Sequence, residues 1–441
     1  MTVPARAHGT APAASVRARV SRDSLWLASG YAATAGSGFV FWLLAAVWIP
    51  QSQLGIEASV LAAVMAAAAL ASNGPGSALV VMLPLGGPAA RETLRRALAA
   101  TAVLALVLGI GAGALVAGLL PSALPPVWIV CAVAACSVAW ALFNLQAQAL
   151  AGASDARATL IVNGSANLLK LGLLALLAVA APATPLILVL ATIVPAIAMT
   201  ALSLAVLIPR ALRVDDRLSG SVRRWDDDLA RAFRRFSFQN AIAVGIVMCA
   251  GLSLSFLVTT LASPVEGAIF AIAFQFSLAL DLVGVAVATA LARSAVGAFA
   301  HTAELAHSYA LKVSLVVAAL GAAAAIATPL MFLLLGRGYP PLYGMAVVGI
   351  LAAASAIRPG YDVWSALSRA RHRVRPVLVG NAVWLLTLGG FVLLLVPRWG
   401  ALGASTAVVC AALVLTVIGI VGLRHAHPDR TAPLPSKGAP A

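Results

Sequence analysis

The chain has 441 residues, of which 62% are hydrophobic and only 10% are charged, and its mean hydropathy is +1.01. Soluble globular domains do not have this profile, so we expect a polytopic membrane protein. Lys and Arg outnumber Asp and Glu by 29 to 14. In a soluble protein this excess would suggest nucleic acid, but in a membrane protein it sets topology, and we expect no nucleic-acid partner.

Long apolar stretches separated by short polar breaks predict membrane-spanning helices and exclude an outer-membrane β-barrel, whose strands would alternate every second residue. Twelve spans are expected, at about 25–49, 58–83, 97–120, 126–150, 159–181, 185–208, 237–262, 267–291, 311–335, 344–367, 377–396 and 400–423. The resulting organisation is a tail (1–22), a six-helix lobe (23–208), a linker (209–236), a second six-helix lobe (237–424) and a second tail (425–441).

The distribution of basic residues predicts the orientation. With the N-terminus inside, 25 of the 29 Lys and Arg residues fall on the cytoplasmic side, and only Arg337 and Arg398 fall outside. This bias places both termini in the cytoplasm. The outer loops are very short and leave no room for an extracytoplasmic enzyme site.

The end of the linker predicts an amphipathic helix. Trp225, Leu229, Phe233 and Phe236 follow the spacing i, i+4, i+8, i+11, with acids and arginines between them. Such a helix suits the membrane surface between two lobes, although a solvated linker helix is an alternative.

A polar stripe crosses the fifth span, where Thr159, Asn163, Asn167 and Lys170 share one helical face. Lys170 lies roughly 16 Å deep, near the middle of the hydrocarbon core, so it should not face lipid. One interpretation is a stripe that hydrogen-bonds a neighbouring helix. The interpretation we favour is a cationic face that lines a cavity for an anionic cargo.

Three more charges lie within spans. Arg358 and Asp362 are one turn apart, with Pro359 and Gly360 between them. The pair either screens itself or marks a kinked helix beside a wet cavity. Asp281 is either a proton or cation site or the charge partner of Lys170 or Arg358.

No motif for covalent chemistry is present. The sequence contains no Walker A, HExxH or GxSxG pattern, and its four cysteines lie within apolar runs without metal-like spacing. We therefore expect no enzyme activity, no cofactor and no metal site. Both halves start at the cytoplasmic side and reach a Pro-containing outer turn, at Pro50 and at Pro264. Repeated lobes of this kind are typical of alternating-access transporters.

Several short segments carry a resemblance to a known family. They are Arg22-Asp23-Ser24 with Trp26, the run from Gly38 to Ala45, the turn from Pro50 to Gly55, and Asn73-Gly-Pro-Gly76 before Leu83-Pro84. Together they resemble bacterial polysaccharide-biosynthesis (O-antigen) flippases of the MOP superfamily. The resemblance implies an all-α, MATE-like pair of six-helix lobes in the bacterial inner membrane, around a cationic lumen.

It also implies the flipping of a polyisoprenyl-diphosphate-linked oligosaccharide to the outer leaflet. Lys170 and Arg358, with Asn163 and Asn167, would then bind the cargo, and Asp281 and Asp362 would bind a coupling ion or pair with a cation. Partners would be the bilayer, a polysaccharide polymerase and glycosyltransferases.

Two other functions remain open at this point. A MATE-type multidrug or metabolite cation antiporter would share the fold and would depend on Asp281 and Asp362 rather than on Lys170. A polysaccharide polymerase or ligase would need a sizeable outer loop with catalytic residues, and we expect no such loop.

Overall fold

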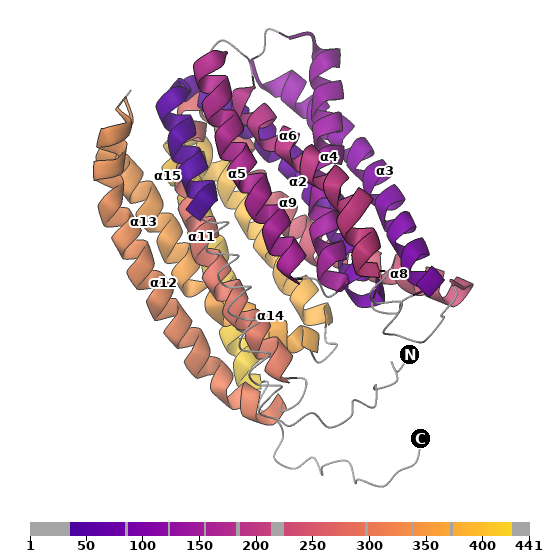
Figure 1. The fold of residues 1–441 in the computed structure, drawn as a ribbon. Coiled ribbons are helices and arrows are strands. Elements are labelled where there is room, and N and C mark those ends of the chain that lie inside the picture. The colour runs from indigo at the N-terminus through magenta and orange to yellow at the C-terminus, as the bar shows by residue number, and fades with distance from the viewer. Residues whose placement is uncertain are drawn as a thin grey trace.

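The structure is a computed structural model, and it describes residues 36–83, 87–121, 124–153, 156–181, 186–212, 225–295, 299–336, 338–370 and 374–425. The predicted N-terminal tail, residues 25–35 of the first predicted span, residues 213–224 of the central loop and residues 426–441 lie outside the described residues. Helices make up nearly all of the described chain, as Figure 1 shows.

The N-terminal half consists of long helices that only a few residues of sequence separate (Figure 1). They are the helix Gly36–Trp48, α2 (Gln51–Met82), α3 (Gly87–Leu119), α4 (Pro126–Gly152), α5 (Ala156–Ala180) and α6 (Ile187–Leu202), which the π-helical η2 (Ser203–Leu207) continues.

The C-terminal half begins with a segmented helix and continues with long ones. Its elements are α8 (Asp227–Asn240), the π-helical η3 (Ala241–Gly245), α9 (Ile246–Leu252), α10 (Leu254–Leu261), α11 (Pro264–Ala295), α12 (Phe299–Leu335), α13 (Pro341–Ile357), α14 (Pro359–Ala370) and α15 (Val374–His425).

The twelve-helix, two-lobe fold predicted from the sequence is confirmed. Ten helices of the described chain are long and apolar enough to cross a membrane, and Gly36–Trp48 is a shorter apolar helix. α15 is 52 residues long, but Gly400 at φ 54° and ψ −129° divides it into two spans. This left-handed backbone favours glycine, and it separates the eleventh span from the twelfth where the sequence places their turn.

The alternation of chain direction defines two ends of the bundle. We call the end where α2 finishes and α8 begins the basic end, and the end where α2, α6 and α11 begin the far end. The names describe the helix ends alone; the sequence predicts that the basic end is cytoplasmic.

The amphipathic linker helix packs on protein and does not lie on the membrane surface, where the sequence suggested it. α8 runs on through η3 and α9 into the seventh span, and its Leu229 and Phe233 are buried in one cluster with Ala78 and Leu79 of α2. At its start, the guanidinium of Arg96 lies 4.8 Å from the Trp225 ring. The apolar stripe thus packs against the N-terminal half instead of lying on a lipid surface, because a protein surface at the basic end covers it.

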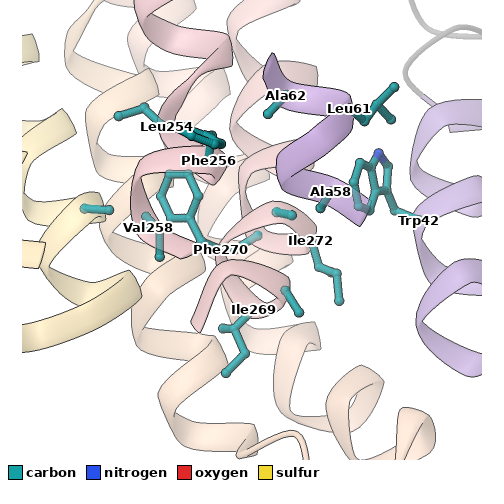
Figure 2. Close-up of a cluster of buried hydrophobic side chains, with 14 of the residues drawn as sticks. Trp42, Ala58, Leu61, Ala62, Leu254, Phe256, Val258, Ile269, Phe270 and Ile272 are labelled. Atoms are coloured by element: carbon teal, nitrogen blue, oxygen red, sulfur yellow. The ribbon is translucent and has the colours of Figure 1, made fainter. Parts of the chain in front are cut away.

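The two halves share a hydrophobic core near the far end. Figure 2 shows Ala62 on the side of α2 that faces Phe256 of α10, while Leu61 points toward Trp42, and Phe270 of α11 belongs to the same buried cluster. Phe270 is fully buried and Leu61 is nearly so. Phe39 and Phe276 extend this contact between the halves with a ring-centroid distance of 4.6 Å. α2 and the helix Gly36–Trp48 therefore both bring the N-terminal half into contact with the C-terminal half.

Candidate functional site

A chamber lies between the two halves, with a cavity volume of about 440 Å³. Helices α2, α4 and α5 line it from one half and α9 from the other. Five of its lining side chains carry amides: Asn73, Asn144, Gln148, Asn163 and Asn167. Asn163 and Asn167, predicted to bind cargo, therefore do face a cavity.

The remaining walls of this chamber are largely apolar. Trp140 and Phe143 are in contact, with tilted rings and 5.3 Å between ring centroids, and Met65 and Met248 line the same cavity from α2 and α9. No charged residue lines the chamber within the part of the chain that the structure describes. The site therefore offers hydrogen-bond donors, acceptors and aromatic faces without net charge.

Gly76 of α2 makes room for one of the amides. A Cβ on Gly76 would lie 2.5 Å from the side-chain amide of Gln148. A larger residue would displace the Gln148 amide, so Gly76 leaves room for this side chain beside the chamber.

Lys170 lies one turn beyond Asn167, outside the set of residues that line the chamber. Its ammonium nitrogen lies 3.7 Å from the centroid of the Phe41 ring, and Phe41 is fully buried. Among the described residues no carboxylate forms a salt bridge with Lys170. The side chain thus points into the protein, and its recorded partner is an aromatic face, which stabilises a desolvated cation.

Arg358 lies between two carboxylates in the C-terminal half. Its Nη1 donates to Asp281 Oδ2 of α11 at 2.8 Å, and its Nε lies 3.5 Å from Asp362 Oδ1 of α14. The three side chains retain 29%, 21% and 13% exposure respectively. Of the partners considered for Asp281, the structure selects Arg358, and the triad carries a formal charge of −1.

The helix break at Pro359 positions this triad. Proline has no amide hydrogen, so α13 ends at Ile357 and α14 restarts at Pro359. The amide of Tyr361 donates to the Arg358 carbonyl, and the Ile357 carbonyl accepts from the hydroxyl of Thr416 on α15 at 2.8 Å. The kink that the sequence suggests is thus present, and a neighbouring helix supplies the hydrogen-bond donor that the break removes.

The predicted site residues fall into two groups. Asn163, Asn167 and Lys170 lie on α5, whereas Arg358, Asp281 and Asp362 form the ionic triad of the other half. No recorded contact within the described residues joins Lys170 to Arg358, so the structure does not assemble them into one cationic cluster.

Two carboxylates at the far end were missed by the sequence reasoning. Glu57 of α2 is 1% exposed and accepts a hydrogen bond from the Leu188 amide at the start of α6, at 2.6 Å. Glu266 of α11 accepts from the Ala401 amide at 2.8 Å and from the Tyr343 hydroxyl at 2.6 Å. Each acid caps a helix whose preceding turn contains a left-handed residue, Leu186 at φ 62° or Gly400 at φ 54°.

A signal for this pair was present in the sequence. Each acid lies one residue before a predicted span, at 58–83 and at 267–291, and had been assigned to the end of an outer loop. Its recurrence in both halves points to a shared structural role.

Comparison with known proteins identifies the fold. No family model and no curated protein matches the chain. Solved structures do match, among them an inward-facing multidrug resistance MATE family transporter of the MOP superfamily, at TM-score 0.67 and 15% identity over 89% of this chain and 94% of that one. A MOP superfamily transporter from Pyrococcus furiosus, described by a reverse polarity of its binding pocket, matches at TM-score 0.63 and 15% identity over 92% and 95%.

An outward-facing MATE family transporter of the same superfamily matches at TM-score 0.60 and 15% identity over 92% and 95% of the two chains. The chain therefore has the fold of MOP superfamily transporters, and it is a multi-pass membrane protein. Two of these three structures are described as MATE family transporters, and the likeness shows a shared fold without singling out polysaccharide flippases.

Proposed function

We propose that the protein is a MATE-type antiporter, which exports amphipathic neutral or cationic solutes by alternating access and takes up a cation in exchange. The observation that carries this proposal is the uncharged, amide- and aromatic-lined chamber between the halves. The proposal includes a bacterial inner-membrane location with the basic end, and both termini, in the cytoplasm.

The size and chemistry of the chamber suit a drug-sized molecule. Small-molecule pockets typically have volumes of about 300–1,000 Å³ and combine apolar walls with a few polar groups. Trp140 and Phe143 offer aromatic faces, which also attract cations, and the amides orient a ligand without demanding a charge. A diphosphate would instead call for several cations, and the described lining contains none.

The triad is the proposed ion-coupling site. Two carboxylates compensate one guanidinium, so the cluster can accept one further positive charge, a proton or a metal cation. A cation at Asp281 or Asp362 would release Arg358 to the other carboxylate, and this exchange of partners across α11 and α14 would couple ion binding to helix movement.

Flipping of a lipid-linked oligosaccharide is the second candidate, and Lys170 favours it. A cation with an aromatic partner and no recorded carboxylate partner among the described residues is available to a phosphate. In this case a polysaccharide polymerase and glycosyltransferases would be the partners.

Dye transport separates the two candidates. In everted vesicles from cells that lack their own exporters, a proton or sodium gradient should drive uptake of a cationic dye. Asp281→Asn should abolish this uptake at matched abundance, and Asp228→Asn should not, because Asp228 pairs with Arg231 on the exposed surface of α8.

Lys170→Met is expected to leave dye uptake intact. If uptake is absent, and Lys170→Met instead abolishes delivery of lipid-linked oligosaccharide to the outer leaflet in flippase-deficient cells, the antiporter proposal is wrong and the flippase is correct.

A further inference from the structure

The backbones of the two halves approach each other closely at the far end, where Gly55 of α2 meets Pro264 of α11. A Cβ on Gly55 would overlap the carbonyl oxygen of Pro264. Gly55 lies within a regular helix, so it is the close approach of the two backbones that requires glycine at this position.

A pair of hydroxyls joins the halves next to this contact. Ser59 Oγ of α2 and Thr259 Oγ1 of α10 are 2.5 Å apart. Ser59 Oγ also lies 3.3 Å from the Ser255 carbonyl, and Thr259 Oγ1 lies 3.3 Å from the Gly55 carbonyl. Both side chains are buried, at 0% and 5% exposure, so these hydrogen bonds form away from lipid and water.

Each hydroxyl has a second acceptor on its own helix. Ser59 Oγ lies 2.7 Å from the Gly55 carbonyl, and Thr259 Oγ1 lies 3.0 Å from the Ser255 carbonyl, both four residues earlier in the chain. If the halves separate, each hydroxyl can donate to its own helix, and no buried donor loses its partner. The hydrogen bonds between the halves can therefore be replaced at little cost by hydrogen bonds within each helix.

The hydrogen bonds of Glu57 and Glu266 have the opposite character. Their acceptor oxygens hold the amides of Leu188 and Ala401 within the same half. Breaking these bonds would leave a buried carboxylate at Glu57 and a half-buried one at Glu266 without a charge-assisted partner, which costs more than exchanging a neutral hydroxyl bond. The turns inside each half are thus held firmly, while the contact between the halves is not.

We propose that Ser59 and Thr259, with Gly55 allowing the approach, form a far-end latch that is closed in this structure and opens in each transport cycle. Glu57 and Glu266 keep the adjoining turns intact in both states. The latch rests on the alternating access of the proposed function. The fold likeness agrees with a closed far end, since the TM-score is 0.67 to the inward-facing MATE structure and 0.60 to the outward-facing one.

Thiol labelling tests the latch without any cargo. In a protein that lacks Cys131, Cys136, Cys249 and Cys410, a reporter Ser255→Cys lies at the latch and is nearly buried. Gly55→Ala should prevent closure and raise the labelling rate by a membrane-impermeant maleimide, applied from the far-end side, by about 5- to 150-fold.

Gly111→Ala is the matched control, because a Cβ there meets nothing within 4 Å. It should leave the labelling rate unchanged. Equal rates in the Gly55→Ala and Gly111→Ala proteins would overturn the proposal.

A cysteine pair provides an independent test that remains decisive if Gly55→Ala fails to fold. In the Ser59→Cys/Thr259→Cys protein, mild oxidation should form a disulfide, stop transport and close the Ser255→Cys reporter to label, and reductant should reverse all three. The single Ser59→Cys variant should show none of these effects. Absence of the disulfide, or full labelling or transport with the disulfide in place, would contradict the latch. A mistaken cargo assignment would leave labelling and cross-linking unaffected, so the two proposals fail separately.

Discussion

Buried carboxylates differ in role according to the partners that surround them. Asp281 pairs with a side-chain cation from another element, Arg358, which a bound ion would replace in the proposed coupling. Glu57 accepts from a backbone amide and from the Gln53 side chain at 2.8 Å, and these donors belong to the same half. Both are carboxylates on membrane-spanning helices, and the donors that surround them separate a candidate coupling site from a helix cap.

Glu57→Gln should destabilise the protein, because a glutamine has an NH₂ group in place of one carboxylate oxygen. That NH₂ would face one of the two groups that donate to Glu57, the Leu188 amide or the Gln53 side chain. The expected cost is about 1–3 kcal/mol, measured as a lower thermal transition of the detergent-solubilised protein. The control is Glu92→Gln, which removes an acid that pairs with Arg95 and Arg96 at the surface. An equal fall in both variants would show that the cap contributes nothing specific.

At the scale of elements, helix interruptions carry much of the functional geometry. The break at Pro359 brings Arg358 between Asp281 and Asp362, and the turn at Gly400 brings the Ala401 amide to Glu266. The π-helical segments η2 and η3 flank the central loop at the ends of the sixth and seventh spans. Irregular backbone of this kind is frequent at functional sites of helical membrane proteins.

Gly400→Ala is expected to disrupt the turn between the last two spans. The residue has φ 54°, and an added Cβ would also meet the Glu266 side chain. A strained backbone and a displaced cap each cost on the order of 1–3 kcal/mol, so folded yield and thermal stability should both fall. Gly390→Ala on the same helix, where a Cβ meets nothing within 4 Å, should keep both near the parent values.

The packing of α8 on the N-terminal half predicts a second effect at this scale. Phe233→Ala removes a ring that is 5% exposed within the cluster at the basic end, and it should cost about 3–5 kcal/mol. Phe238→Ala on the same helix is the control, because Phe238 is 67% exposed. Similar decreases in thermal stability for the two variants would contradict the packing of α8 on the N-terminal half.

At the scale of the whole molecule, two lobes that contact each other mainly through α2 on one side and α8, α10 and α11 on the other have a neutral chamber between them. An ionic triad lies within the second lobe. The chamber and the triad belong to different parts of the fold, and the latch joins the halves at the far end. Movement of one half against the other would therefore change the exposure of the chamber while each half keeps its own capped turns.

Reporter fusions test the orientation of this molecule. Fusions after Arg91, Arg224 and Arg373 should report the cytoplasm, because most of the basic residues share that side. Fusions after Ser122, Pro264 and Tyr339 should report the outside. A reporter that gives the reverse result at any site in the second half would contradict the six-plus-six topology.

Composition and hydropathy determined the class of protein, the number of spans and the position of the central loop. The reason is that each span must be apolar over its whole length and must satisfy its backbone within one helix, so every span is visible locally. The kink at Pro359 was visible for the same reason, since it follows from one residue's missing amide hydrogen.

Only the tertiary structure decided which polar groups meet. It placed Arg358 rather than Lys170 beside Asp281, directed Lys170 to Phe41, and brought Ser59 to Thr259 across 200 residues of chain. A polar residue inside a span must find a partner, but its own helix does not say which neighbouring helix provides one. Which helices become neighbours depends on helix packing, and close contacts such as Gly55 against Pro264 help to set that packing. The packing decided that the cavity between the halves is a neutral chamber and not a cationic lumen.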